Sequence, residues 1–172
     1  LFTDEINRSG KIGLDAGTYY IRIKHWNSSW VISSTYTVRA SFTASAKYET
    51  EINNSPSTAD EIDNNVFVYG SIRSKGDEDW YKFTLTEKGY ISIWFAHPKA
   101  DTTNTRWEIY LYRDDAVTSV DGGKCYWAIS GNENVQTAEI GVEAGTYYVK
   151  VKPWNDSWVV DSTYTLDVYF TA

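Results

Sequence analysis

The sequence repeats itself at one fixed distance. Residues 13–44, GLDAGTYYIRIKHWNSSWVISSTYTVRASFTA, return at residues 141–172 as GVEAGTYYVKVKPWNDSWVVDSTYTLDVYFTA, without a gap and at an offset of 141 − 13 = 128. Self-similarity at so long a period indicates an array of whole domains rather than a solenoid of small units. We therefore interpret residues 45–172 as one complete repeat and residues 1–44 as the C-terminal third of a preceding repeat, so that the chain is an excerpt of a longer array.

One repeat of this length can bury a core without help from metals or disulfides. The chain has 8 Trp and 14 Tyr but no Met, and aromatic and β-branched residues favour strands. Its single cysteine, Cys125, cannot form an internal disulfide and is expected to be a packed thiol. Stability must therefore come from packing.

Short alternating segments predict eight strands, near 66–72, 79–86, 89–96, 106–113, 124–129, 135–140, 146–152 and 162–170. Turn clusters separate them, among them Asp121-Gly122-Gly123. Residues 48–65 are acidic and rich in turn residues, and we expect an ordered loop there with a helical turn at 58–62. The pattern predicts an all-β fold, a jelly-roll-like antiparallel β-sandwich.

The two faces of each strand can be separated by the parity of its residues, because side chains alternate across a sheet. We expect one set to face the core: Tyr81, Phe83, Leu85, Ile91, Ile93, Phe95, Trp107, Ile109, Leu111, Tyr147, Val149, Val151, Tyr164, Leu166, Val168 and Phe170. The outer faces then carry Tyr90, Trp94, Tyr110, Tyr112, Tyr148 and Tyr169. Contiguous exposed aromatic surface usually marks a binding site or an interface.

Three motifs together resemble one domain family. Glu49-Thr50-Glu51-Ile52-Asn53-Asn54 comes first, then Gly76-Asp77-Glu78-Asp79-Trp80-Tyr81-Lys82-Phe83, and finally Ala144-Gly145-Thr146-Tyr147-Tyr148-Val149-Lys150-Val151. Over most of 46–172, their order resembles the bacterial pre-peptidase C-terminal domain, to which the collagen-binding domains of clostridial collagenases are related. The resemblance implies a non-catalytic module of an exported protein that often binds calcium.

The acidic loop is a candidate calcium site. Calcium takes six to eight oxygen ligands, and Glu49, Glu51, Asn53 and Asn54 offer four oxygen-bearing side chains within six residues. The resemblance implies that Asp77 and Asp79, before the aromatic strand, complete the site. The alternative is that Glu51 and Asp79 cap turns while Asp77 is solvated.

The loop between the last two predicted strands carries two tryptophans. Trp154 and Trp158, with Asn155 and Asp156 between them, are suited to stack on sugar rings and to bond their hydroxyls. The alternative is that both indoles cover the end of the sandwich or a neighbouring repeat. We consider a second platform formed by Trp94, Tyr90, Tyr110 and Tyr112 on a sheet face, and expect Trp80 and Trp107 to be buried by packing.

The composition restricts the partners. A net charge of −7 argues against nucleic acid and anionic membranes as partners, and no apolar run is long enough to insert into a membrane. Motifs for a metalloprotease or a nucleophile elbow are absent from the sequence. We therefore expect no enzyme, and a secreted or bacterial cell-surface protein.

We predict a module that binds polysaccharide or another extracellular polymer, with calcium stiffening its acidic loop. One alternative is a structural repeat of a surface protein or filament, in which residues 1–44 pair with a neighbouring copy by strand donation or domain swapping. The other alternative is an accessory domain of a secreted peptidase or glycosidase.

Overall fold

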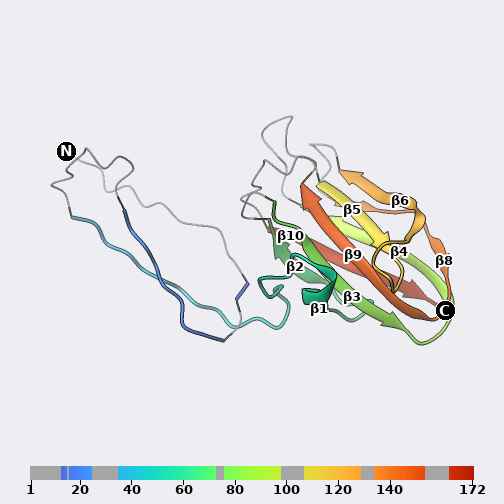
Figure 1. The fold of residues 1–172 in the computed structure, drawn as a ribbon, viewed down its shortest axis with the longest axis horizontal. Helices are drawn as coiled ribbons and strands as arrows, with labels where there is room; N and C mark the ends of the chain where they lie inside the picture. Colours follow the sequence, from blue (N-terminus) through green and yellow to red (C-terminus); the bar gives the residue numbers. More distant parts are fainter. Residues whose placement is uncertain are drawn as a thin grey trace.

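The fold consists of two β-sheets that pack face to face (Figure 1). The structure, a computed structural model, describes residues 13–14, 16–24, 35–72, 76–97, 107–128, 134–153 and 163–172, and only the backbone of 121–128. The first sheet has the order β1 (Asp60–Glu61), β3 (Asp79–Leu85), β9 (Gly145–Pro153), β5 (Trp107–Tyr112) and β6 (Ser119–Ala128). The second has the order β2 (Val68–Ser71), β10 (Thr163–Thr171), β4 (Gly89–Ala96) and β7 (Asn134–Gln136), and β8 (Ile140–Val142) also pairs with β4.

The last two strands of the chain occupy inner positions, one in each sheet. Strand β9 is antiparallel to both β3 and β5, with Tyr81 opposite Val149 and Leu111 opposite the same residue. Strand β10 is antiparallel to both β2 and β4. Both edges of β9 and of β10 are thus hydrogen-bonded, so each of these strands joins its two neighbours within its own sheet.

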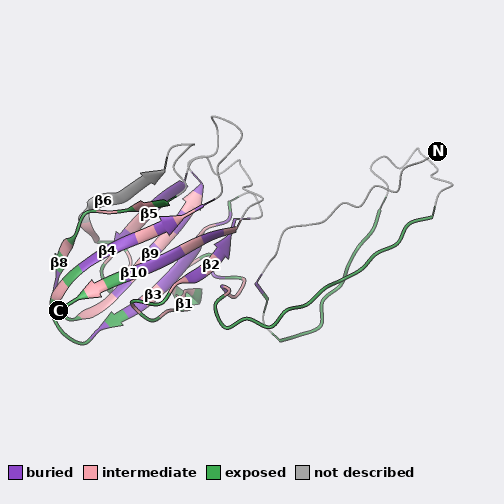
Figure 2. Cartoon of the chain, turned by 180° about the vertical axis from the view of Figure 1, so that it is seen from behind, coloured by how far each residue is buried: buried purple, intermediate pink, exposed green. Residues whose placement is uncertain are grey.

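The core lies between the two sheets, and it confirms the predicted faces. Of the sixteen side chains predicted to face inward, all but Phe170 are buried, and Phe170 is half-buried against the core. Buried residues, drawn in purple, alternate mainly with half-buried ones, drawn in pink, along β9 in Figure 2. The largest residue of the core is Trp107, which is 1% exposed and contacts the rings of Phe95 and Tyr164 edge-on. The hydrophobic core therefore consists of fifteen of the residues that the alternation selected, together with Val68, Ile72 and Val142.

Three predicted segments differ from the structure. Asp121-Gly122-Gly123 lies within β6 rather than in a turn, in a stretch where the pairing with β5 is irregular and its register shifts between Tyr110 and Tyr112. The predicted strand at 135–140 is divided into β7 and β8, which both pair with β4. The helical turn expected at 58–62 is a 3₁₀ turn at Pro56–Thr58, followed by β1, which is parallel to β3.

Residues 16–24 and 35–45 form an extended arm that projects away from the sandwich (Figure 1). Neither segment of the arm belongs to a sheet, and all of their residues are exposed. The chain enters the sandwich through two isolated parallel bridges, between Leu14 and Glu51 and between Tyr48 and Tyr69.

Candidate metal centre

The acidic loop is held against both sheets by backbone hydrogen bonds. The amide of Glu49 donates to the carbonyl of Tyr69 in β2 at 2.9 Å, and the amide of Trp80 in β3 donates to the carbonyl of Asn53 at 3.0 Å. Because β2 and β3 belong to different sheets, the loop closes one end of the sandwich. This position carries its polar side chains into the interior.

Glu49 lies at the centre of this end and is 2% exposed. One carboxylate oxygen, Oε1, accepts hydrogen bonds from the amide of Ser71 at 2.6 Å and from its hydroxyl at 3.2 Å. The other, Oε2, accepts one from the hydroxyl of Tyr81 at 2.8 Å. A buried carboxylate with several donors around it is fixed in position, so Glu49 can present its oxygens to a ligand without reorganisation.

A chain of oxygens connects Glu49 to Asp79 through two phenols. The hydroxyl of Tyr81 lies 2.8 Å from Glu49 and 2.6 Å from the hydroxyl of Tyr164, which in turn lies 2.5 Å from Oδ2 of Asp79. These are three hydrogen-bonding contacts, but two phenols supply only two protons. A third proton, on one of the two carboxyl groups, would satisfy all three contacts. Without this proton, both Glu49 and Asp79 would be negatively charged, and a cation beside them would have to offset the repulsion between the two carboxylates.

Three carboxylates converge at this point. Glu49, Glu51 and Asp79 each offer one oxygen, and these oxygens lie within 4.8 Å of one another. Two buried oxygens, Oδ1 of Asn53 and Oδ1 of Asp79, have no hydrogen-bond partner among the described residues. Buried polar atoms without partners are rare in proteins. An ion that accepts oxygen ligands would provide the missing partner.

The environment raises the pKa values of all three carboxyl groups. Burial raises the pKa of Glu49 to about 7. Burial and then the charge of Asp77 raise the pKa of Glu51 to about 7. Burial, followed by the charge of Glu49, raises the pKa of Asp79 well above its ordinary range. At neutral pH, the cluster therefore holds protons unless a cation replaces them.

The structure brings most of the predicted ligands together. Glu49, Glu51 and Asp79 form the cluster, and Asn53 and Asp77 are buried in the same end of the sandwich. Asn54 is different because its side chain is exposed. In the amide orientation that satisfies both groups, its nitrogen donates to Oδ1 of Asp77 at 3.0 Å. Asn54 is thus placed to hold Asp77 rather than an ion.

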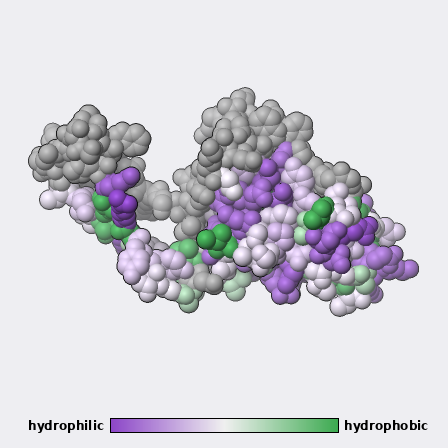
Figure 3. Space-filling view, viewed as in Figure 1, coloured by the Kyte–Doolittle hydropathy of each residue, from purple (hydrophilic) through white to green (hydrophobic). Residues whose placement is uncertain are grey.

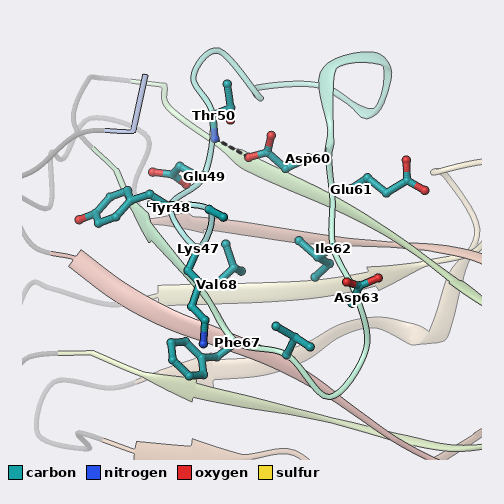
Figure 4. A pocket seen from close by; sticks show the side chains of 12 residues that line it. Lys47, Tyr48, Glu49, Thr50, Asp60, Glu61, Ile62, Asp63, Phe67 and Val68 are labelled. Carbon is teal, nitrogen blue, oxygen red and sulfur yellow. Dashed lines mark hydrogen bonds between the residues drawn. The ribbon is translucent and has the colours of Figure 1, made fainter. Parts of the chain in front are cut away.

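Sequence reasoning missed Asp60, which organises the loop from β1. Oδ2 of Asp60 accepts hydrogen bonds from the amide of Thr50 at 2.8 Å and from the side chain of Asn53 at 3.3 Å. Figure 4 shows Asp60 beside Thr50 and Glu49 at the wall of a pocket of about 200 Å³. The only signal for this role was an acidic residue that follows a Pro-Ser-Thr turn.

The donor set fits a hard divalent cation. All side chains of the cluster coordinate through oxygen, and neither His nor Cys is among them. Calcium prefers such carboxylate and amide oxygens, whereas zinc and copper sites usually include nitrogen or sulfur. The residues present therefore fit the cation that the family resemblance implies. Bound there, it would neutralise the repulsion among Glu49, Glu51 and Asp79.

The predicted aromatic platforms are separated by the fold. Trp154, Asn155, Asp156 and Trp158 lie outside the described residues. Tyr110 and Tyr112 are on β5, whereas Tyr90 and Trp94 are on β4 of the opposite sheet. The four residues expected to form one second platform thus lie on the outer faces of two different sheets, and they cannot form a single surface.

Aromatic rings form a row on the outer face of β3, β9 and β5. The ring of Tyr112 stacks on Trp80 at 5.4 Å and on Tyr110 at 6.1 Å, and Tyr148 contacts Trp80 edge-on. The ammonium group of Lys150 lies within 6 Å of three of these rings. Trp80 is 6% exposed because its neighbours cover it, which confirms that it is buried by packing. We call Trp80, Tyr110, Tyr112, Tyr148 and Lys150 the aromatic row.

Charged groups border the aromatic row. Glu78 forms ion pairs with Lys150 at 3.7 Å and with Lys152 at 3.9 Å. The hydroxyl of Tyr110 donates to Glu108 at 2.8 Å, and burial, followed by this hydrogen bond, raises the pKa of Tyr110. Figure 3 views this face, where hydrophilic residues gather over the C-terminal end of β9. The face combines flat rings with hydrogen-bonding groups.

The fold and these features define a β-sandwich domain with an acidic cluster at one end. Residues 77–153 match the family model of the bacterial pre-peptidase C-terminal domain. The resemblance expected from the sequence is thus confirmed over this stretch, which runs from Asp77 to the end of β9. The chain matches no curated protein sequence.

Solved structures of several proteins are similar to this chain. One is the pre-peptidase C-terminal domain of collagenase from Bacillus anthracis, at 19% identity, with 64% of this chain and 93% of that chain covered and a TM-score of 0.48. Another is CorA, described as a surface-associated copper-binding protein of Methylomicrobium album BG8, at 10% identity, with 66% and 98% covered and a TM-score of 0.42. A third is the Yersinia pseudotuberculosis-derived mitogen, at 18% identity, with 62% and 85% covered and a TM-score of 0.38.

Within the described part of the chain, no helix has the length and apolar character needed to cross a membrane.

Proposed function

We propose that the chain is a non-catalytic module of a secreted or cell-surface bacterial protein, and that it binds polysaccharide or another extracellular polymer. The observation that carries this proposal is the aromatic row on the outer face of β3, β9 and β5. The family match supports the accessory character of the module, since the family is named for a domain appended to peptidases. An accessory domain of a secreted peptidase or glycosidase is therefore one setting in which this function would operate.

The aromatic row suits a polymer of sugar rings. The planes of Tyr110 and Tyr112 differ by 13°, and those of Tyr112 and Trp80 by 22°. Rings with nearly parallel planes form a continuous apolar strip against which the C–H groups of pyranose rings can pack. Trp80 is buried below Tyr112, so it holds the phenol in place rather than contacting the ligand.

Charged groups beside the strip would supply specificity. Glu78, Lys150 and Lys152 form a connected set of donors and acceptors on the same face. Carbohydrate hydroxyls require such groups at the edge of a stacking surface, because each desolvated hydroxyl needs a hydrogen-bond partner. A mixed set of charges also favours a neutral polymer over a strongly charged one.

Calcium has a structural role in this proposal. The acidic cluster lies at the loop that joins β2 to β3 through backbone hydrogen bonds. A cation there would tie Glu49 and Glu51 of the loop to Asp79 of β3 and would fix the end of the strand that carries Trp80. In this proposal, the cation stiffens the domain and the aromatic row contacts the polymer.

The test is binding to insoluble polysaccharides, measured as the depletion of protein from solution. Replacing Tyr112 by Ala removes the middle ring of the row, and we expect about tenfold weaker binding, which corresponds to ~1.4 kcal/mol. The matched control is Tyr90→Ala, since Tyr90 is a 57% exposed tyrosine on the opposite sheet. Equal binding by the wild type and both variants, or equal losses in both variants, would refute the role of the aromatic row.

A variant of the tryptophan loop distinguishes the platform predicted there from the aromatic row. If Trp154→Ala with Trp158→Ala abolishes binding while Tyr112→Ala has no effect, the polymer site is the loop and not the aromatic row. Circular dichroism and thermal melting of each variant would show that the sandwich is intact.

A further inference from the structure

We infer that residues 13–44 are the ninth and tenth strands of a second sandwich, whose other strands come from a polypeptide stretch of the 45–140 type joined ahead of Gly13. This inference concerns an interaction surface, the arm, and it does not depend on polymer binding. It rests on a comparison of the two copies of the repeated segment, residues 13–44 and 141–172, which have similar sequences but opposite environments.

The arm corresponds to strands β9 and β10 position by position. Subtracting the offset of 128 from β9 (Gly145–Pro153) and β10 (Thr163–Thr171) gives residues 17–25 and 35–43. The described parts of these segments are extended in the arm as they are in the sandwich. The backbone of the arm therefore already has the form of the two strands, without the sheets around them.

Side chains that form the core in one copy are in solvent in the other. Tyr36 is 71% exposed, whereas its equivalent Tyr164 is 0% exposed. The other pairs show the same contrast: Ile21 at 62% against Val149 at 0%, Ile23 at 49% against Val151 at 0%, and Val38 at 55% against Leu166 at 0%. Phe42 is 88% exposed, whereas Phe170 is half-buried against the core. An apolar surface of this extent in water indicates a missing partner.

The two segments of the arm cannot serve as strand partners for each other. In the complete copy, β9 and β10 belong to different sheets and face each other across the core, so no ladder joins them. Each pairs on both of its edges with other strands, β9 with β3 and β5 and β10 with β2 and β4. The arm consequently needs four partner strands, and the described parts of 16–24 and 35–45 belong to no sheet.

A second copy of this chain is a poor partner. Its sandwich already contains β9 and β10 in the inner positions of both sheets. If the arm replaced them, it would release an equally apolar pair of strands into solvent, and no net surface would be buried. Only a sandwich that lacks its own ninth and tenth strands gains from the arm. A stretch of the 45–140 type contains β1 to β8 and has this property.

The test uses a chain in which a second copy of residues 45–140 replaces residues 1–12. This copy then directly precedes Gly13, which is the equivalent of Gly141. Hydrogen exchange of backbone amides is then compared with that of the chain 1–172. In 1–172, residues 18–24 and 35–43 should exchange at nearly the unfolded rate. In the extended chain their exchange should slow at least a hundredfold, toward the rates of 146–152 and 163–171.

A matched variant controls for folding. Tyr36→Ser in the extended chain should abolish protection of the arm and leave 146–152 protected. Residues 146–152 belong to the sandwich of residues 45–172, which has its own ninth and tenth strands and therefore folds without the arm. An arm that still exchanges at the unfolded rate in the extended chain would overturn the inference. So would protection of the arm in 1–172 alone, whether light scattering shows a dimer, which would identify a second copy as the partner, or a monomer.

Discussion

The strongest quantitative prediction concerns the protons held by Glu49. Burial raises its pKa in the folded protein to about 7, from an ordinary value of 4.5 that applies to the unfolded chain. Between pH 4.5 and pH 7, the folded protein therefore binds a proton that the unfolded chain has released. The free energy of unfolding must fall as the pH rises through this window, and the loss is complete above pH 7.

The magnitude follows from the difference between the two pKa values. A difference of 7 − 4.5 = 2.5, at 1.36 kcal/mol for each pH unit, gives a loss of about 3 kcal/mol between acidic and alkaline pH. For a domain of this size, that loss lowers the melting temperature by roughly 10 °C. Calcium would abolish the loss, because the bound cation favours the ionised form.

The perturbation is Glu49→Gln, which keeps the shape of the side chain but cannot ionise. In EDTA, the melting temperature of the wild type should fall between pH 5 and pH 8, and that of the variant should fall less, because it lacks the contribution of Glu49 while Glu51 and Asp79 still have raised pKa values. In calcium, the wild type should gain most at pH 8 and least at pH 5, and the variant should gain little at either pH.

The control is Glu61→Gln, since Glu61 is exposed and forms only a surface ion pair with Lys82 at 3.5 Å. Such pairs contribute little to stability, so this variant should follow the wild type under all conditions. Wild-type protein that melts at the same temperature at pH 5 and pH 8 in EDTA, and that calcium does not stabilise, would refute the reasoning.

Three further substitutions test the packing around the cluster. Gly70→Ala should unfold the domain or lower its melting temperature strongly, because a Cβ at Gly70 would clash with the ring of Tyr164 and with Oε2 of Glu49; an unchanged melting curve would contradict this. Trp107→Ala should cost about 3–5 kcal/mol in urea unfolding, since Trp107 is 1% exposed within the core. Tyr164→Phe removes the hydroxyl that donates to Asp79 and should cost about 1–3 kcal/mol, with a smaller loss when calcium is present.

The faces of the strands could be predicted because alternation is a local property of the sequence. Tyr147, Val149 and Val151 had to lie on one side of their strand, and the sandwich provides only one buried side. The ends of the strands, in contrast, depend on which other strands they pair with, and this is not a local property of the sequence. Asp121-Gly122-Gly123 has the composition of a turn, but it lies within β6, where the flanking residues Ser119 and Lys124 pair with Tyr112 and Tyr110 of β5. The pairing of the flanking residues here overrides local propensity.

The acidic cluster could be predicted in part, because its loop ligands are close in sequence and the family resemblance added Asp77 and Asp79. The hydrogen-bonding network behind it could not. Tyr81 and Tyr164 alternate with core residues and carry no signal that distinguishes them from other buried tyrosines. Their hydroxyls meet only because β3 and β10 come from opposite sheets at the same end of the sandwich.

The inner positions of β9 and β10 have a consequence for synthesis on the ribosome. Both sheets depend on strands at the C-terminal end of the domain, so the earlier strands emerge from the ribosome before the strands that separate them in space. Such non-local pairing makes folding slow and leaves strand edges open until β9 and β10 have been synthesised. Until then the nascent domain is exposed to aggregation, and chaperones that shield strand edges would be needed most just before β9 and β10 emerge.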